Sequence, residues 1–306
     1  MKTAAQIRAA SSWCRKAPSP VVFVPTMGAL HEGHASLIRK ARRVADSTAS
    51  RASTASTAST ASTASTASKG SVVVSIFVNP RQFGPKEDLS RYPRPFAADR
   101  ALCRNERVDL LFHPSVESMY ADDHSVSVHE TTLSKGFCGA SRVGHFDGVC
   151  TVVAMLFQII APDIAIFGEK DWQQLAVIRR MVRDLRMPVK IMAHPTIREN
   201  DGLALSSRNR FLTSEDRSVA PRIYESLKAR SKEASEGEVS VARLRRDLIR
   251  DLSAIPGAKV EYAEIVNEST LSPMKKIGEG GTARALVALR LGAVRLIDNM
   301  ALPSPR

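Results

Sequence analysis

The stretch "VVFVPTMGALHEGH" (residues 21–34) joins a short apolar run to a glycine-containing turn and the start of a helix. Residues 21–25 are continuous, apolar and rich in β-branched side chains, which is typical of a strand buried on both faces. From Gly33 onward apolar residues recur at helical spacing. A buried strand that feeds directly into an amphipathic helix predicts the beginning of a βαβ unit. The apolar face of the predicted helix carries Leu37, Ile38, Ala41, Val44 and Ala45.

The alternation of strand and helix continues along the first two thirds of the chain. Strands are predicted at 71–80, 108–114, 164–171 and 188–193, and a core helix at 148–163. This order predicts an α/β fold with a Rossmann-like, doubly wound parallel sheet in residues 1–197. A further helix is predicted to place Leu175, Ile178, Met181, Val182 and Leu185 on one stripe.

The pattern changes after about residue 198. Two charged amphipathic helices are predicted near 215–235 and 240–254, followed by strand-like runs at 259–267 and 284–298. Residues 198–306 are therefore predicted to form a smaller C-terminal α+β domain.

Composition limits the class of protein. The 306 residues are 43% hydrophobic and 25% charged, and 44 Lys and Arg against 31 Asp and Glu give a net charge of +13. Such a balance suits a nucleic-acid partner or an enzyme that handles phosphates and carboxylates, but no block of basic residues favours the former. The four cysteines form no CxxC pair, and no apolar run is long enough to span a bilayer. We expect a cytoplasmic protein with no nucleic-acid or membrane partner.

Polar residues follow three of the predicted strands at the point where each strand ends. They are residues 26–34 after the first strand, 79–83 after the second and 168–171 after the fourth. Ligands of parallel α/β sheets bind at the carboxyl ends of the strands. These three groups are therefore expected to converge on one edge.

His31 and His34 are candidates for binding phosphate. They lie one turn apart at a helix start, where free amides and the helix dipole favour an anion. Two imidazole donors there would suit a triphosphate from which pyrophosphate leaves. The alternatives are two turn histidines without a role and, less favoured, a zinc site, for which no third ligand is apparent.

Other polar residues allow both a functional and a structural interpretation. Lys170 is either a phosphate ligand or a solvated lysine, and the donor-rich 205–209 loop either wraps phosphate or begins a capped helix. Gln82 and Gln174 suit a substrate with hydroxyls and a carboxylate, although surface glutamines are commoner. Residues 136–149 are interpreted as a flexible loop that closes over a site or as a surface connection.

Several motifs together resemble a known family. The HxGH motif and the serine-rich loop resemble the nucleotidyltransferase superfamily that includes class I aminoacyl-tRNA synthetases. The motifs "PTMGALHEGHASLIRKAR", "SIFVNPRQFGPKEDLSRYPR", "GHFDGVCTVV", "FGEKDWQQL" and "DGLALSSRNRFL" are more closely similar to the pantoate–β-alanine ligase (pantothenate synthetase) family. The resemblance covers the chain except residues 48–71.

The resemblance implies a reaction and a set of site residues. Pantoate would be activated with ATP and Mg²⁺ to pantoyl adenylate and pyrophosphate, and β-alanine would then displace AMP to give pantothenate, in an enzyme that is generally a homodimer. The catalytic residues would be His34, as proton donor, together with His31, Lys170 and Arg208. Gln82, Gln174, Asn79, Tyr92, Arg142 and His145 would bind the acid substrates. ATP would be held by Met27, Gly28, Ala29, Leu30, His31, Glu32, Gly33, His34, Gly168, Glu169, Lys170, Asp171, Ile197, Leu205, Ser206, Ser207 and Arg208.

The repeat "STASTASTASTASTAS" (53–68) has no side chain able to build a core. Candidate site residues lie on both sides of it, so it is interpreted as part of an insertion (48–71) in a helix-to-strand loop rather than as a domain linker. Such a loop lies opposite the ligand-binding edge and should cost only about 1–3 kcal/mol. We expect it to be poorly ordered and dispensable.

Three alternatives remain open on the sequence alone. They are another adenylyl- or cytidylyltransferase of the HxGH type, a basic nucleic-acid-binding protein, and an inactive relative impaired by the repeat. Release of pyrophosphate with pantoate, ATP and Mg²⁺, followed by release of AMP on adding β-alanine, would separate all three.

Overall fold

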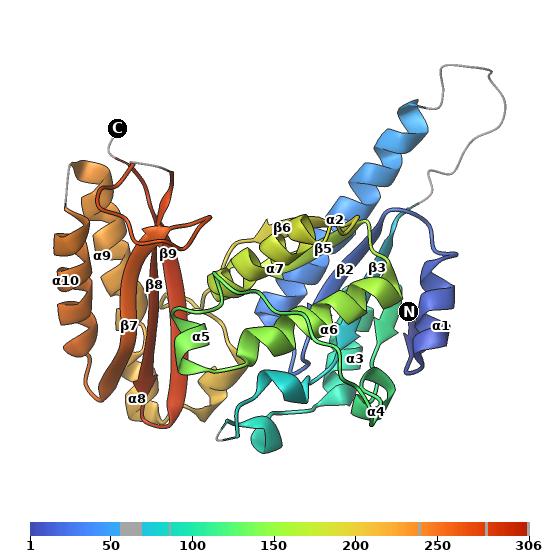
Figure 1. Cartoon of the computed structure of the whole chain (residues 1–306), viewed down its shortest axis with the longest axis horizontal. Helices are drawn as coiled ribbons and strands as arrows, with labels where there is room; N and C mark the ends of the chain where they lie inside the picture. The colour runs from blue at the N-terminus through green and yellow to red at the C-terminus, as the bar shows by residue number, and fades with distance from the viewer. Residues whose placement is uncertain (56–68, 86, 238–239, 279–280, 305–306) are drawn as a thin grey trace. The chain divides into compact units, whose positions relative to one another are not determined.

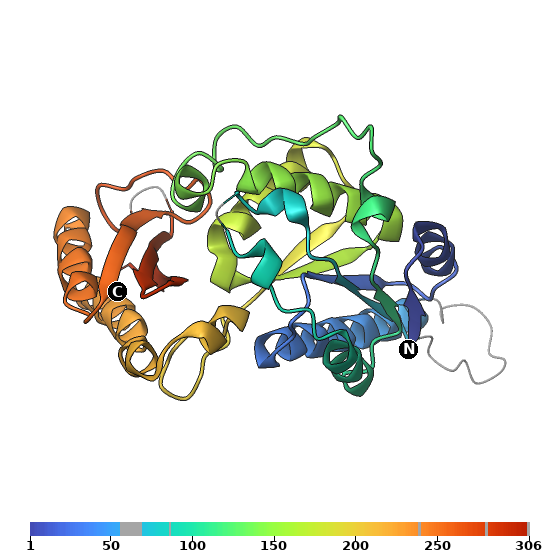
Figure 2. The ribbon, with the colours of Figure 1, turned by 90° about the horizontal axis from the view of Figure 1, so that it is seen from below.

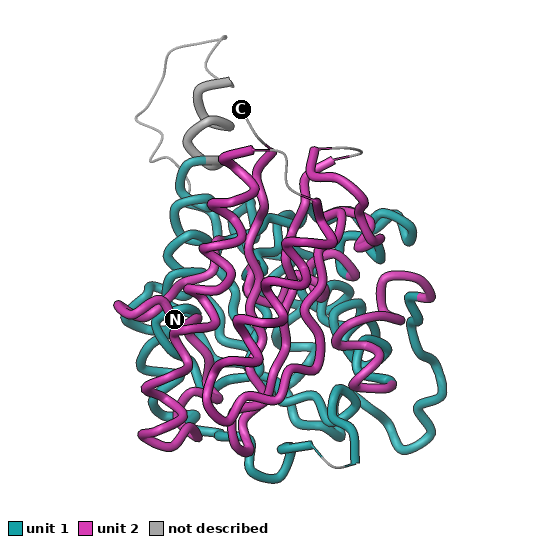
Figure 3. The backbone as a smooth tube through the Cα atoms, turned by 90° about the vertical axis from the view of Figure 1, so that its left-hand side faces the viewer, with its two compact units in different colours: residues 1–130, 144–168, 178–194 teal, residues 131–143, 169–177, 195–306 magenta. Residues whose placement is uncertain are grey.

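The computed structural model describes residues 1–55, 69–85, 87–237, 240–278 and 281–304, and of residues 48–55 only the backbone. The chain forms two compact units, shown in two colours in Figure 3. The first unit contains residues 1–130, 144–168 and 178–194, and the second contains 131–143, 169–177 and 195–306.

The first unit is built on a parallel sheet. Among the described residues six strands pair in the order β1-β4-β3-β2-β5-β6, and every neighbouring pair is parallel. The predicted Rossmann-like sheet is thus confirmed, with one addition: β1 is too short, at three residues, to leave a periodic signal. The strands are β1 (Lys2–Ala4), β2 (Val21–Thr26), β3 (Ser71–Ile76), β4 (Leu110–Phe112), β5 (Ile164–Gly168) and β6 (Lys190–His194).

Helices cover both faces of this sheet (Figures 1 and 2). Helices α2 (Glu32–Ala55) and α3 (Phe96–Asn105) lie on one face, and α1 (Ile7–Cys14) and α6 (His145–Ile160) lie on the other. Under α2 and α3 a hydrophobic core forms from side chains of the central strands and the two helices. The unit also contains α4 (Val116–Met119) and the short 3-10 helices η1 (Pro80–Gln82) and η2 (Leu89–Arg91).

Helix α7 (Trp172–Asp184) begins in the second unit and ends in the first. Leu175, Ile178 and Met181 of the predicted stripe are buried. The prediction is wrong for Leu185, which follows the last helical residue and is 53% exposed.

The repeat region differs from the prediction at both ends. Helix α2 continues to Ala55, so residues 48–55 are not a loop. Alanine is the strongest helix former, and adding residues to an existing helix needs no new nucleus. At the other end, Ser71 already belongs to β3 and is buried, with its hydroxyl donating to the Pro18 carbonyl at 2.8 Å. Residues 56–68 of the predicted insertion lie outside the described residues.

The second unit is a smaller α+β structure. Its described strands, β7 (Ala258–Asn267), β8 (Ala283–Leu291) and β9 (Val294–Leu302), form an antiparallel sheet in sequence order. The prediction of a single strand at 284–298 is therefore wrong. This segment is a hairpin that turns at Gly292, whose φ of +55° suits glycine. Similarly, the helix predicted at 215–235 is two helices, α8 (Ser214–Val219) and α9 (Arg222–Glu236).

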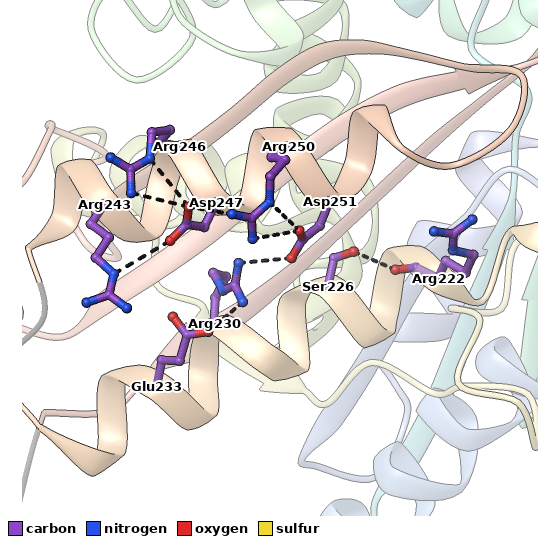
Figure 4. Close-up of polar contacts among 9 residues, drawn as sticks. All are labelled: Arg222, Ser226, Arg230, Glu233, Arg243, Arg246, Asp247, Arg250 and Asp251. Carbon is purple, nitrogen blue, oxygen red and sulfur yellow. Dashed lines mark hydrogen bonds and ion pairs between the residues drawn. The ribbon is translucent and has the colours of Figure 1, made fainter.

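Helices α9 and α10 (Val241–Ser253) pack on this sheet through a core that includes Leu227, Leu244, Leu248 and Leu289. Figure 4 shows ion pairs within and between the two helices. Arg230 on α9 donates to Asp251 of α10 at 2.9 Å and to Glu233 at 2.5 Å. On α10, the carboxylate of Asp247 is surrounded by the guanidinium groups of Arg243, Arg246 and Arg250.

The units differ from the predicted domains, 1–197 and 198–306, in two respects. The main division falls at His194/Pro195, and residues 131–143 and 169–177 group with the second unit. Hydrogen bonds account for this grouping. The Asn299 side chain of β9 donates to the carbonyls of Glu169 and Lys170, at 2.8 and 2.9 Å, and the Cys138 sulfur lies 3.1 Å from the Tyr262 hydroxyl of β7.

Candidate active site

The strand order of the parallel sheet marks where a ligand should bind. From β2 the chain crosses to β3 on one side, and from β5 it crosses to β6 on the other. Ligands of doubly wound sheets bind at such a switch point, outside the carboxyl ends of the strands. The turn after β2 carries residues 27–34, and β5 ends at Gly168. A Cβ built on Gly168 would meet no atom within 4 Å, so packing does not require a glycine there.

The turn after β2 is closed by hydrogen bonds from its own amides. Gly28 and Ala29 both have positive φ, +82° and +50°. The Gly28 amide donates to the Thr26 hydroxyl at 3.2 Å, and the Ala29 and Leu30 amides donate to the carboxylate of Asp99 at 2.9 and 2.8 Å. The amides of residues 28–30 thus already have acceptors within the chain.

The two histidines cap the start of helix α2. The Gly33 amide donates to His31 Nδ1 at 3.1 Å, and the His31 amide donates to His34 Nδ1 at 3.3 Å. This resembles the reciprocal arrangement of a capping box, with imidazoles in the place of Ser/Thr and Glu/Gln, except that the N-cap side chain accepts from the second helical amide instead of the third. Because both Nδ1 atoms accept, each neutral ring carries its hydrogen on Nε2. The ring centroids are 4.2 Å apart. Neighbouring Glu32 forms an ion pair with Arg39.

Asn79 and Gln82 lie together in a buried polar network after β3. Asn79 is completely buried and uses both ends of its amide: Nδ2 donates to Gln82 Oε1 at 3.1 Å and to the Gly148 carbonyl at 3.0 Å. Its Oδ1 accepts from the Tyr120 hydroxyl at 2.9 Å and from the Arg81 amide at 3.3 Å. Asn79 thus orients Gln82, whose Nε2 lies 3.6 Å from the Met27 sulfur.

His145 supports the same segment from helix α6. It is 9% exposed, and its Nδ1 lies 2.8 Å from the Gln82 carbonyl. The interpretation of 136–149 as one flexible loop is wrong, because residues 138–141 form α5 (Cys138–Ser141) and α6 begins at His145. Tyr92, 7% exposed, packs edge-on against Phe83 with ring centroids 5.9 Å apart.

The second unit holds the remaining candidates. Lys170 lies in the short helix η3 (Glu169–Asp171), with its ammonium 3.9 Å from the Asp171 carboxylate. Asn299 binds two carbonyls of this helix, as described above. Gln174 lies in the first turn of α7, and Arg142 follows α5.

A hairpin-like turn brings Ile197 next to the serine loop. The Leu205 amide donates to the Ile197 carbonyl at 3.0 Å, and Arg198 pairs with Ala204 in an antiparallel bridge. The Arg198 guanidinium binds the Asp298 carboxylate through two hydrogen bonds of 2.6 and 2.9 Å. Ser206 caps η4 (Ser207–Phe211) by accepting from the Arg208 amide at 3.2 Å. The structural interpretation of Ser206 is thus correct, and its hydroxyl hydrogen is still able to donate.

Residues 27–34, Asn79, Gln82, Tyr92, His145 and Gly168 belong to the first unit, and Arg142, 169–171, Gln174, Ile197 and 205–208 belong to the second. Direct contacts link Met27, Gln82, Asn79 and His145, join His31 to His34, and join Ile197 to Leu205. Among the described residues no three His, Cys, Asp or Glu side chains form a potential metal cluster. In the same part of the chain, every helix is too short or too polar to cross a bilayer.

The chain matches the family model described as pantoate-beta-alanine ligase over residues 1–51 and 59–301. The chain belongs to the pantoate–β-alanine ligase family. The unmatched residues are 52–58, within the predicted insertion, and 302–306. Pantothenate synthetase of Thermotoga petrophila is 46% identical over 299 residues, which is 98% of both chains.

Solved structures of the ligase family share the fold. Pantothenate synthetase from Thermus thermophilus is 44% identical, with a TM-score of 0.86 over 99% of this chain and 100% of that one. The pantoate-beta-alanine ligase of Francisella tularensis, solved in complex with β,γ-ATP and β-alanine, is 33% identical, with a TM-score of 0.74 over 98% and 97% of the two chains.

Sequence reasoning missed three residues that hold the candidate site. Asp99 and Asn299 left a weak signal in the sequence, since each is a polar residue in a largely apolar stripe or strand. The structure buries both side chains. Tyr120, whose partner Asn79 lies 41 residues away, left no signal.

Proposed function

We propose that this chain condenses pantoate with β-alanine, using ATP and passing through a pantoyl adenylate. The proposal rests on one observation: the chain belongs to the ligase family, and its capped histidine pair lies in the turn after β2, at the switch point of the parallel sheet. The proposed products are pantothenate, AMP and pyrophosphate.

In the first step the pantoate carboxylate attacks the α-phosphorus of ATP, and pyrophosphate leaves. Both reactants are anionic, so the site must offset their repulsion and the charge that develops on pyrophosphate. We assign this role to the Nε2 hydrogens of His31 and His34, the ammonium of Lys170, and Arg208 with the hydroxyls of Ser206 and Ser207. No protein nucleophile is needed, because the substrate carboxylate supplies the attacking atom.

Pantoate is assigned to the glutamines. Because Gln82 Oε1 accepts from Asn79, its Nε2 is the atom that would donate to a pantoate oxygen. Gln174 would bind the same substrate, and Arg142, Tyr92 and His145 are expected near the acid substrates. Asn79 acts through Gln82, since both ends of its own amide are used inside the protein.

In the second step the amine of β-alanine attacks the acyl carbon of pantoyl adenylate, and AMP leaves. The mixed anhydride must be kept from water until the amine arrives. Throughout both steps, Ile197 is the candidate for contacting the adenine ring through its backbone.

Mg²⁺ is proposed to enter with ATP. Mg²⁺ keeps much of its hydration shell and is commonly held by substrate phosphates with one or two carboxylates. The described residues fit that mode better than a cage made of protein ligands, because they contain no cluster of three acidic or histidine side chains. Bound to the triphosphate, the ion would neutralise part of its charge.

A homodimer in the cytoplasm is proposed as the working state. The four cysteines are free and buried, which suits a reducing compartment. Sedimentation equilibrium would test the dimer.

The test compares two variants of His34. His34→Ala removes the imidazole and the helix cap, whereas His34→Gln removes the imidazole but keeps a side chain that is ordinary at this capping position. We expect pantoate-dependent pyrophosphate release to fall at least about 100-fold in both variants, as for loss of an electrostatic group. Near-normal release by His34→Gln would overturn the role of His34. Absence of pantoate-dependent release by the unmodified chain would overturn the function.

A further inference from the structure

Asp99 is a buried carboxylate that binds the turn of the candidate ATP loop. It lies in the first turns of α3 and is 2% exposed. Its two oxygens accept from consecutive backbone amides 70 and 69 residues earlier in the chain: Oδ2 from Ala29 at 2.9 Å and Oδ1 from Leu30 at 2.8 Å. Hydrogen bonds to an ionised acceptor are about twice as strong as neutral ones.

The turn needs such a partner because its backbone is unfavourable without one. Ala29 has a φ of +50°, and a non-glycine residue in this left-handed region costs roughly 1–2 kcal/mol. Gly28, at +82°, precedes it, and a Cβ there would lie 3.0 Å from Asp99 Oδ2 and from the Ile76 side chain. Glycine suits position 28 because of both its positive φ and the nearby carboxylate, and the two hydrogen bonds to Asp99 offset the strain at position 29.

We propose that Asp99 is the positioning residue of this loop: it fixes residues 28–30 before ATP binds and thereby orients the His31–His34 cap. His31 follows the second anchored amide directly, and its own amide donates to His34 Nδ1. The inference rests on the proposed function, in which these histidines bind the triphosphate. It adds that the amides of Ala29 and Leu30 donate to Asp99 and not to phosphate, which would accept its hydrogen bonds from the imidazoles.

The substitution Asp99→Asn tests this role. One oxygen becomes an NH₂ group that faces a backbone donor, so one anchored amide loses its acceptor. We expect the KM for ATP to rise at least about tenfold while the KM for β-alanine stays within about twofold, since a misplaced group is felt by the substrate that it contacts.

Asp163→Asn is the matched control. Asp163 also accepts from a backbone amide of β2, but at the other end of the strand: its Oδ2 accepts from the Val21 amide at 2.6 Å and from the Ser19 hydroxyl at 2.9 Å. A merely structural carboxylate would lower the melting temperature in both variants and leave the KM for ATP alike in the two. That result would overturn the proposal.

Hydrogen exchange of the unmodified protein tests the anchoring without catalysis and without a variant that must fold. The Ala29 and Leu30 amides should exchange slowly in the absence of nucleotide, and a non-hydrolysable ATP analogue should leave their rates unchanged. Fast exchange that slows only when the analogue is added would show that phosphate, not Asp99, is the acceptor, and would overturn the proposal. Slow exchange in a chain that binds no ATP would keep the anchor and reject the proposed function.

Discussion

At Gly148 helix α6 lies directly against the backbone of the Gln82 segment. A Cβ built on it would lie 2.2 Å from the Arg81 carbonyl oxygen, 2.5 Å from the Arg81 carbonyl carbon and 2.8 Å from the Gln82 amide nitrogen. All three atoms are backbone, so no side-chain rotation relieves the contact. The substitution Gly148→Ala should therefore push helix η1 away from α6.

The size of the displacement follows from these distances. Real Cβ contacts are essentially never shorter than 3.0 Å, so the two backbones must separate by about 0.8 Å. Gln82 moves with Arg81, and its links to Asn79 and His145, at 3.1 and 2.8 Å, stretch. Overpacking costs typically 1–3 kcal/mol, partly offset by the roughly 1 kcal/mol by which alanine is the better helix former. A misplacement near 1 Å is able to cost about 100-fold in rate.

We expect the folded Gly148→Ala protein to lose about 10- to 100-fold in kcat/KM for pantoate. The assay is pantoate-dependent pyrophosphate release, with thermal unfolding measured on the same preparation. Gly84→Ala is the control in the neighbouring segment, because a Cβ there meets nothing closer than 3.7 Å. Wild-type kcat/KM in Gly148→Ala, with an unchanged melting temperature, would refute the reasoning.

Three further outcomes are expected. Tyr120→Phe removes the hydroxyl bound to Asn79. It should lower stability by about 1 kcal/mol, measured by denaturation, and raise the KM for pantoate several-fold, measured by steady-state kinetics. Because burial raises the pKa of Tyr120 to about 12, both effects should be constant between pH 6 and 9. Asn299→Leu should raise the KM for ATP without changing that for β-alanine, since the η3 carbonyls lose their donor. Burial, with Arg43, Lys40 and Arg39 nearby, lowers the pKa of His194 in the folded protein. Because the unfolded chain then binds the proton more tightly, the free energy of unfolding should fall as pH drops from about 7 toward 5. Melting curves of His194→Gln should show a shallower fall over the same range.

Most of the fold could be predicted because its signals are local. The run at 21–25 and the helical stripe that follows it each reflect burial of one continuous element, and the strand–helix alternation then leaves few topologies. The errors fall where local pattern is ambiguous. An apolar run at 284–298 does not show that the chain reverses at Gly292, and an alanine-rich repeat continues a helix that hydrophobic periodicity would end.

In the candidate site, too, the parts with a local sequence signal could be predicted and the others could not. Motifs contiguous in sequence, such as residues 27–34 and 205–208, could be identified as units. The groups that hold them come from distant elements: Asp99 lies 70 residues from Ala29, and Asn299 lies 130 residues from Glu169. A sequence shows the residue types of such pairs but not their proximity, which is decided by how the strands are ordered in each sheet.

Four polar side chains of the candidate site share one feature of their contacts within the chain. His31 and His34 each accept a backbone hydrogen at Nδ1, Gln82 accepts at Oε1, and Ser206 accepts at its hydroxyl oxygen. In each of these contacts the side chain uses an acceptor atom, and its polar hydrogens are the groups that the proposed function assigns to the substrates: Nε2–H of imidazole, the Nε2 hydrogens of the amide, and the hydroxyl hydrogen. ATP, pantoate and pantoyl adenylate carry mainly anionic or acceptor oxygens. A site whose acceptors are already satisfied avoids repelling these oxygens, and its donors are oriented before the substrates arrive, which is the condition for electrostatic stabilisation without reorganisation.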